Sequence, residues 1–243
     1  MNENALFRLA LGLASPWEVK SLEFSVEKKR LDITLDFAKG SRFPCPVCGK
    51  PCGVHDTENR TWRHLNFFQH ETYLHARQPR VDCLEHKVKT VEVPWARAGA
   101  GFTLLFEALV MVLARNGMTA NAIGRMVGEH DTLIWRILEH YVEEARSRVD
   151  LSGVSQVGLD ETSRSKGHKY VTVFMDLEQR RIVYATEGKG AETLVAFKAD
   201  LEEHGGCAET VNEFSLDMSP AFQSGIQKEF PHAQMTFDPF HLM

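Results

Sequence analysis

The chain has 243 residues, 43% of them hydrophobic, which is enough to bury one large core or two to three small ones. No apolar run reaches the about 18 residues of a membrane span and the first residues do not form a signal peptide, so we expect no membrane contact and a cytoplasmic location. The net charge of −5 argues against a protein that coats nucleic acid, but 14 acidic against 8 basic residues after position 150 suit a site that collects divalent cations.

The N-terminal residues predict a short helix followed by a β-rich module. Residues 4–13 have apolar side chains at helical spacing, and Ser15 with Pro16 ends the segment. From Trp17 to Phe37 apolar and polar residues alternate, most regularly after position 30, as in a strand with one buried face. We place this helix and the β module in residues 1–92.

Two pairs of metal-ligand residues lie in the β module. Cys45 and Cys48 form a C-x-x-C knuckle, and Cys83 and His86 form a C-x-x-H pair. Without a secretory signal such clustering indicates metal before disulfide, and four protein ligands would make a closed, structural Zn²⁺ site. Cys52 is an alternative ligand, but its spacing fits a free thiol better. Two unrelated pairs of residues are the alternative to zinc.

Basic and aromatic residues alternate between the two pairs. Strands that track a phosphate backbone have this pattern, but so does a solvated face over a small core, and both alternatives stay open. Two of the histidines, His70 and His75, also compete for zinc, though they lack the knuckle spacing. The basic positions are His55, Arg60, Arg63, His64, His70, His75, Arg77 and Arg80, and the aromatic ones are Trp62, Phe67, Phe68 and Tyr73.

Residues 93–150 predict a helix-turn-helix unit. Val91 to Phe102 contains a proline and glycine-alanine steps, which are typical of a linker. Helical periodicity follows at 103–115, 120–128 and 132–149, with a short turn before the last helix, as in DNA-binding helix-turn-helix proteins. A small helical bundle that binds no DNA has the same spacing.

In the DNA-binding interpretation the third helix is the recognition helix, which contacts the DNA bases. Its early residues His130, Thr132 and Arg136 are then candidates for base or phosphate contact. Its core-facing residues are expected to be Ile134, Ile137, Leu138 and Tyr141.

Residues 151–243 predict a mixed α/β domain. Strands joined by tight turns are followed by strands alternating with helices, which indicates a sheet with antiparallel and parallel parts. The predicted strands are 154–160, 169–176, 180–186, 210–217 and 233–238, and the predicted helices are 190–204 and 219–230.

Aspartates end three of these strands, at Asp160, Asp217 and Asp238. An isolated aspartate at a strand end is usually a turn residue or a helix cap. If the first and fourth strands are parallel neighbours, however, Asp160 and Asp217 project from one sheet edge. Two carboxylates so placed suit phosphoryl transfer, in which shared ligands hold two Mg²⁺ ions roughly 3.5 to 4 Å apart.

At these residues the sequence resembles the IS-L-three family of bacterial insertion-sequence transposases, whose catalytic domain has the ribonuclease-H-like fold of the DDE superfamily. The resemblance implies a homo-oligomeric enzyme in the bacterial cytoplasm, at the nucleoid, that binds transposon-end and target double-stranded DNA. It also implies strand cleavage and transfer with Mg²⁺ or Mn²⁺. The matching motifs, which follow the family's order, are CPVC with CLEH, the helix-turn-helix at 103–147, GLDETSRSKGHKYVTVFMDLEQRRIVYATEGK, SLDMSPAF and DPFHL.

The same resemblance assigns the site residues. It implies that Asp160 and Asp217 are the first two acids of the metal-binding triad, and that Asp238 and His241 form a D-x-x-H element beside the active site. The pair Cys83 and His86 departs from the family, which more often has two cysteines there.

The triad's closing glutamate is expected on a helix beyond the last strand, and this sequence stops before such a helix. The resemblance therefore implies the N-terminal portion of a longer transposase, with residues 151–243 as a truncated catalytic domain. The alternative is a catalytically inactive DNA-binding remnant or a regulator of transposition. A zinc-dependent hydrolase fits poorly, because the protein supplies all four expected zinc ligands.

Overall fold

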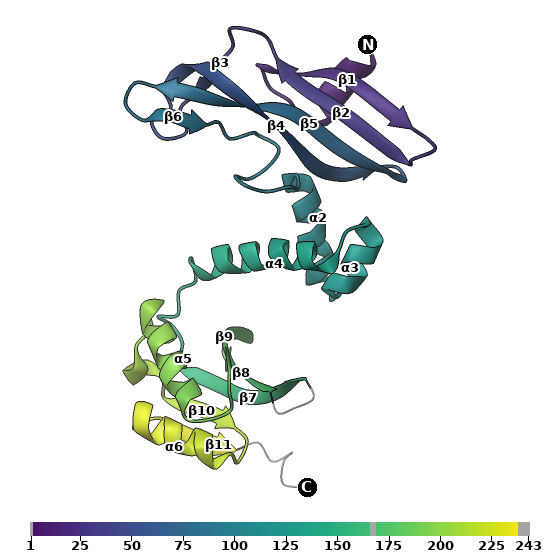
Figure 1. The fold of residues 1–243 in the computed structure, drawn as a ribbon. Coiled ribbons are helices and arrows are strands. Elements are labelled where there is room, and N and C mark those ends of the chain that lie inside the picture. The colour runs from purple at the N-terminus through teal and green to yellow at the C-terminus, as the bar shows by residue number, and fades with distance from the viewer. Residues whose placement is uncertain (1, 166–168, 238–243) are drawn as a thin grey trace. The chain divides into compact units, whose positions relative to one another are not determined.

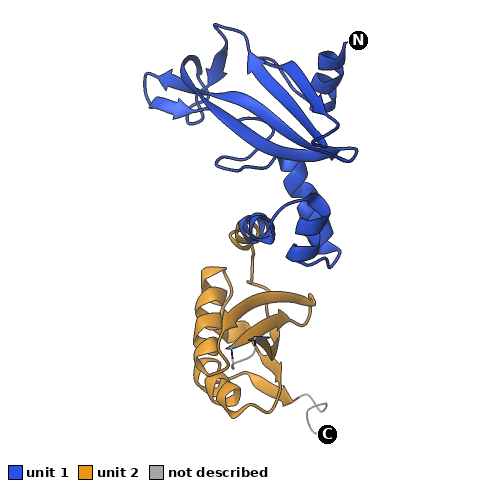
Figure 2. Ribbon diagram, turned by 45° about the vertical axis from the view of Figure 1, so that its right-hand side comes forward, with its two compact units in different colours: residues 1–142 blue, residues 143–243 orange. Residues whose placement is uncertain are grey.

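Two separate sheets organise the computed structural model, which describes residues 2–165 and 169–237 (Figure 1). The chain divides into two compact units, residues 1–142 and 143–243 (Figure 2). Among the described residues, no helix combines the length and the apolar character needed to cross a membrane. Each unit is described by itself below.

The first unit begins with one helix and a six-stranded sheet, in the order β1-β2-β5-β4-β3 with β6 beside β5. The alternating stretch from Trp17 to Phe37 forms two antiparallel strands rather than one, because the chain reverses between Ser25 and Arg30, where Lys29 takes a φ of 48°. The elements are α1 (Glu3–Ala10), β1 (Trp17–Ser25), β2 (Arg30–Phe37), β3 (Arg42–Pro44), β4 (Pro51–Phe67), β5 (His70–Cys83) and β6 (Lys87–Thr90).

The segment 91–102 has no regular helix or strand, but the expectation of a linker is wrong. Val91, Val93 and Trp95 are buried in the core of the first sheet. The ring of Trp95 packs edge-on against Trp17 and Trp62, with centroids 4.8 and 5.5 Å apart. The apolar residues at every second position therefore pack this segment into the core. The glycine-alanine steps that follow suggested a linker and gave no sign of this packing.

Three helices complete the first unit: α2 (Leu104–Arg115), α3 (Ala120–Val127) and α4 (Asp131–Arg146), the last of which continues into the second unit. Thr103 and Thr119 cap α2 and α3 through their side-chain oxygens, which accept backbone N–H groups. The helices enclose an apolar core of their own. The predicted helix-turn-helix arrangement is confirmed, with Ile134 and Ile137 buried and Leu138 and Tyr141 packed against the same core.

The second unit is built on a five-stranded sheet in the order β11-β10-β7-β8-β9. β8 and β9 are antiparallel to their neighbours, whereas β10 and β11 run parallel, which confirms the predicted mixed sheet. The elements are β7 (Gln156–Ser165), β8 (Lys169–Asp176), β9 (Arg181–Glu187), α5 (Glu192–Glu203), a 3-10 turn (Ala208–Thr210), β10 (Glu213–Leu216), α6 (Pro220–Glu229) and β11 (Gln234–Phe237).

Aromatic rings join the helices of the second unit to its sheet. Phe174 of β8 stacks on Phe197 of α5 with ring centroids 4.3 Å apart, and Phe230, just after α6, contacts both Phe197 and Phe214 of β10. All four rings are fully buried. This core holds β7 and β10 side by side and so positions the acidic site.

Candidate metal centres and DNA-binding helix

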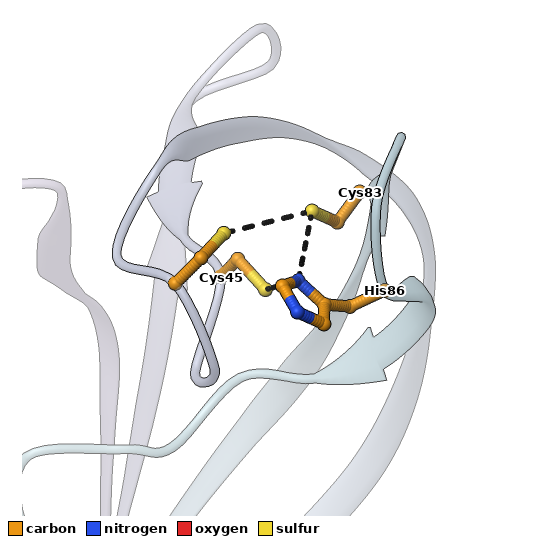
Figure 3. A group of neighbouring side chains, drawn as sticks. Cys45, Cys83 and His86 are labelled. Carbon is orange, nitrogen blue, oxygen red and sulfur yellow. Dashed lines mark hydrogen bonds between the residues drawn. The ribbon is translucent and has the colours of Figure 1, made fainter.

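Two turns of the first sheet bring the four predicted zinc ligands together. Cys45 and Cys48 lie in the turn between β3 and β4, while Cys83 ends β5 and His86 lies in the turn to β6. The first turn is closed by the Gly49 N–H, which donates to the Cys45 carbonyl over 2.8 Å. Figure 3 shows Cys45, Cys83 and His86 pointing toward one another.

The distances between the ligand atoms fit a tetrahedral zinc ion. Cys48 Sγ lies 3.8 Å from Cys83 Sγ, and His86 Nδ1 lies 3.8 Å from Cys45 Sγ and 3.6 Å from Cys83 Sγ. All four donor atoms fall within 4.8 Å of one another. Donors at tetrahedral angles, with Zn–S near about 2.3 Å and Zn–N near about 2.0 Å, are themselves separated by roughly 3.5 to 3.8 Å.

Backbone amides favour the thiolate form of two ligands in this cluster, Cys45 and Cys83. The N–H groups of Cys48 and Val47 lower the pKa of the Cys45 thiol. The N–H groups of His86 and Glu85 lower the pKa of the Cys83 thiol to about 7. The thiolate is the form that ligates metal, so the turns contribute charge stabilisation as well as geometry.

The other candidate ligands lie outside this cluster. Cys52 is buried, and its thiol donates to the Lys50 carbonyl over 3.3 Å. His75 bonds to Asp32 through Nε2 over 2.6 Å and to Thr61 through Nδ1 over 2.9 Å. Neither belongs to the Cys-Cys-Cys-His group.

Most of the alternating basic residues are engaged within the sheet. Arg77 pairs with Asp36 over 2.7 Å, Arg80 forms two hydrogen bonds to Asp56, and Arg63 is only 3% exposed. Trp62 is buried in the core. These partners favour the structural interpretation of the pattern over a surface that tracks phosphates.

The acidic site forms where β7 and β10 run in parallel. Ser215 is the partner of Gly158, and continuing this register by two residues sets Asp217 beside Asp160. Neighbouring strands are separated by about 4.8 Å, so both carboxylates can reach one divalent cation. The two aspartates line a cavity of about 350 Å³ together with Thr162.

Each aspartate is oriented by a local backbone bond. Asp160 Oδ1 accepts the Glu161 N–H over 2.8 Å, and Asp217 Oδ1 accepts the Ser219 N–H over 3.1 Å. Asp160 is exposed and Asp217 is half-buried, so both are open to a ligand. The predicted accessory residues Asp238 and His241 lie outside the residues that the structure describes.

The predicted DNA-contact residues lie at the start of α4, on the side away from the helical core. Thr132 and Arg136 are exposed, as is His130, which precedes the helix. His130 Nδ1 lies 2.9 Å from both Thr132 Oγ1 and Asp131 Oδ1. The imidazole is thereby held against the first turn of the helix.

Trp135 is a candidate that the sequence interpretation missed. Its side chain is 60% exposed on α4, although large aromatic side chains are usually buried. It lies one helical turn from Thr132 and next to Arg136, on the same face. Excluding the core positions of the helix would have revealed it, because Trp135 is not one of them.

Three family models match this chain in consecutive segments. Residues 41–86 match the zinc-finger of transposase IS204/IS1001/IS1096/IS1165. Residues 91–142 match the helix-turn-helix domain of transposase family ISL3, and residues 157–243 match the ISL3 transposase domain of DDE type. The chain belongs to the ISL3 transposase family. The resemblance inferred from the motifs is thus confirmed.

Two curated relatives extend this match over the whole chain. The transposase for insertion sequence element IS1557 of Mycobacterium tuberculosis is 27% identical over 258 residues, covering 100% of this chain and 56% of that protein. The transposase for IS1001 of Bordetella parapertussis is 29% identical over 204 residues, covering 82% of this chain and 49% of that protein. The chain therefore spans about half the length of the curated relatives it matches.

Two solved structures also resemble this ISL3 chain at low scores. The HTLV-2 integrase catalytic core domain in complex with magnesium is 20% identical, with a TM-score of 0.27 over 37% of this chain and 63% of that one. A simian T-cell lymphotropic virus intasome in complex with a PP2A regulatory subunit is 16% identical, with a TM-score of 0.29 over 53% and 50%.

Proposed function

We propose that this chain supplies the zinc-binding, DNA-binding and acidic elements of an insertion-sequence transposase that binds transposon ends and catalyses metal-dependent cleavage and transfer of DNA strands. The observation that carries the proposal is the parallel pairing of β7 with β10, which sets Asp160 and Asp217 at one sheet edge. The three parts are residues 1–92, 93–150 and 151–243.

Residues 1–92 hold a structural zinc ion in this proposal. The ligands are the thiolates of Cys45, Cys48 and Cys83 and the Nδ1 atom of His86, whose separations suit a tetrahedral ion. Four protein ligands leave no coordination position for water, so this ion ties β3, β4 and β5 together rather than taking part in chemistry.

Residues 93–150 bind double-stranded DNA of the transposon end. Because that DNA is part of the bacterial chromosome, binding would locate the protein at the nucleoid. His130, Thr132 and Arg136 are the proposed contact residues, because they share the exposed start of α4. Trp135 adds an apolar surface to the same face. A homo-oligomer would let two copies hold two transposon ends.

Residues 151–243 hold the catalytic cation, Mg²⁺ or Mn²⁺, between Asp160 and Asp217. When bound, such an ion lowers the pKa of a ligated water and offsets charge on the phosphodiester. The two aspartates act as ligands and not as general bases. Asp238 and His241 are proposed as accessory residues near this site.

The test is metal-dependent nicking, by a protein extended to the full length of the curated relatives, of a duplex that this chain selects from a random-sequence library. We expect cleavage with Mg²⁺ or Mn²⁺ that Asp160→Asn reduces by about 100-fold or more, because a metal ligand is lost. Glu202→Gln, an exposed carboxylate of α5, serves as the control and should cleave normally.

Activity that survives Asp160→Asn would overturn the catalytic assignment. Salt-dependent binding of the selected duplex, without cleavage in either metal, would instead support a regulator that only binds DNA.

A further inference from the structure

Arg63 is a buried charge that the proposed function does not use. It lies in β4 and is only 3% exposed, although arginine is rarely buried without a partner. Removing a guanidinium from water is costly unless its N–H groups and charge are matched by acceptors and anions. Its contacts therefore indicate what this residue holds in place.

Part of the Arg63 side chain binds its own sheet. Its terminal nitrogens donate to the carbonyls of His64 and Thr72 and, over 2.5 Å, to the side chain of Asn66. The guanidinium also lies 5.3 Å from the ring centroid of Tyr73. These contacts fix the guanidinium relative to β4 and β5.

The same guanidinium binds the turn of the helix-turn-helix. One terminal nitrogen donates to the carbonyl of Val127 over 3.2 Å, and Nε lies 3.3 Å from Glu129 Oε1. Val127 is the last residue of α3, so its carbonyl belongs to the negative end of the helix dipole, where a cation is favourable. A residue of the zinc-bearing sheet thus caps a helix of the DNA-binding unit.

This turn decides where the recognition helix begins. Gly128 takes a left-handed φ of 79°, and the Glu129 N–H donates to the Gly124 carbonyl over 2.9 Å. A side chain at Gly124 would lie 2.6 Å from the Glu129 carbonyl oxygen, so α3 and the turn are in close contact. His130, the first proposed contact residue, follows Glu129 directly.

A second buried ion pair holds α4 further along its length. Glu107 of α2 is fully buried and accepts from Arg97 Nε at 3.0 Å on both oxygens. The hydroxyl of Tyr141 on α4 donates to the same carboxylate over 2.9 Å. Arg97 lies in the segment that packs on the first sheet, so α4 is tied to that sheet near its start and about three turns later.

We propose that Arg63 is a positioning residue for DNA recognition. It fixes the start of α4 on the zinc-bearing sheet, so that the sheet holds the recognition helix rigidly while the helix contacts DNA. Arg63 does not touch DNA in this view, because it is buried. The inference rests on the proposed DNA-binding function and adds to it a residue outside the helix-turn-helix.

The experiment compares Arg63→Met with the matched control Arg77→Met, an exposed arginine of the same sheet that pairs with Asp36. The probes are a duplex selected from a random library by the unaltered protein and a scrambled duplex of equal composition. For Arg63→Met we expect roughly tenfold weaker binding of the selected duplex, from the lost charged hydrogen bonds, and unchanged binding of the scrambled one. Arg77→Met should keep both affinities.

Amide hydrogen exchange without DNA gives an independent measurement. Arg63→Met should speed exchange in residues 124–134, while bound zinc stays at the level of the unaltered protein. Two milder variants guard against misfolding: Arg63→Lys keeps the charge but not the forked donors, and Glu129→Gln keeps the shape but not the ion pair. Both should speed exchange in the turn to a smaller degree.

The inference is wrong if Arg63→Met keeps the ratio of selected to scrambled affinity, or if exchange in the turn does not change in any of the three variants. It also falls if the unaltered protein selects no sequence from the library. That last result overturns the proposed function itself, so the two failures are distinguishable.

Discussion

Ser215 lies opposite Gly158 in the parallel pair of β10 and β7, two residues before an aspartate on each strand. The parallel direction of this pair matters for the chemistry, because the residues that follow Gly158 and Ser215 then lie side by side: Asp160 within β7, and Asp217 directly after β10. An antiparallel pair would send Asp160 and Asp217 to opposite ends. The acidic site therefore depends on the direction of one strand pair.

Mn²⁺ should bind between Asp160 and Asp217 at lower concentrations than elsewhere in the second unit. We expect paramagnetic broadening of the amide resonances of residues 158–162 and 215–219 at the lowest Mn²⁺ concentrations. Asp217→Asn should raise the Mn²⁺ concentration for half broadening by about tenfold, since one of two carboxylate ligands is lost. The control Glu202→Gln should not change the titration. Broadening that begins elsewhere in residues 143–237 would contradict the site.

Zinc removal should unfold the first sheet locally. Cys45→Ser should lose zinc and lower the melting temperature of residues 1–142 by about 10 °C or more, because metal binding contributes directly to the stability of such turns. Cys52→Ser is the matched control, since a serine hydroxyl can also donate to the Lys50 carbonyl. Metal analysis and calorimetry check both. Retention of zinc by Cys45→Ser, or its loss from Cys52→Ser, would require a different ligand set.

Acid should destabilise the first unit through His64. Burial lowers the pKa of His64 to about 4, from an unfolded value near about 6.5, and Nδ1 lies 2.9 Å from the Thr103 hydroxyl. The unfolded chain therefore binds the proton first as pH falls. The contribution of His64 to the free energy of unfolding is fully present above a pH of about 6.5. It is lost progressively as the pH falls to about 4, by up to about 3 kcal/mol.

Urea unfolding at a series of pH values, with zinc content monitored, tests this slope. His64→Asn offers an acceptor without a titratable ring, so its stability should change less between these pH values. Parallel curves for the two proteins would show that His64 does not contribute.

Arg146 should be required for the stability of the second unit. Its terminal nitrogens donate to the Val183 carbonyl over 2.5 Å and to both oxygens of the half-buried Asp200. Arg146→Met should destabilise residues 143–243 by about 2–4 kcal/mol, because it removes the guanidinium that binds both oxygens of the Asp200 carboxylate. Arg148→Met removes only an exposed pair with Glu144 and should cost no more than about 0.5 kcal/mol. Hydrogen exchange of the α5 amides measures both effects, and equal protection in the two variants would refute the assignment.

Trp135 should contribute to DNA affinity without supporting the fold. Trp135→Ala should weaken binding of a library-selected duplex by about tenfold, because an exposed indole offers apolar contact area in the groove. Val142→Ala, which also shortens an exposed apolar side chain of α4, should bind normally. Fluorescence anisotropy measures the affinities and calorimetry checks the fold. A large fall in melting temperature for Trp135→Ala would indicate a structural role instead.

Local chemistry made much of this protein readable in advance. The C-x-x-C and C-x-x-H pairs specify their turns within a few residues, and the strand and helix periods around Leu31, Ile134 and Phe174 depend only on which side chains are apolar. The alternation from Trp17 to Phe37 predicted strand character but not the reversal near Lys29, because that turn contains neither glycine nor proline.

The sequence by itself therefore determined the order of modules, the four zinc ligands as candidates and Asp160 and Asp217 as candidate acids, but not that β7 continues to Ser165, well past Asp160. Tertiary structure alone decided that β10 runs parallel to β7, that the segment after β6 packs into the core through Trp95, and that Arg63 pairs with Glu129. These outcomes join residues dozens of positions apart. Such contacts follow from which surfaces meet when the core closes, and no local period in the chain encodes that choice.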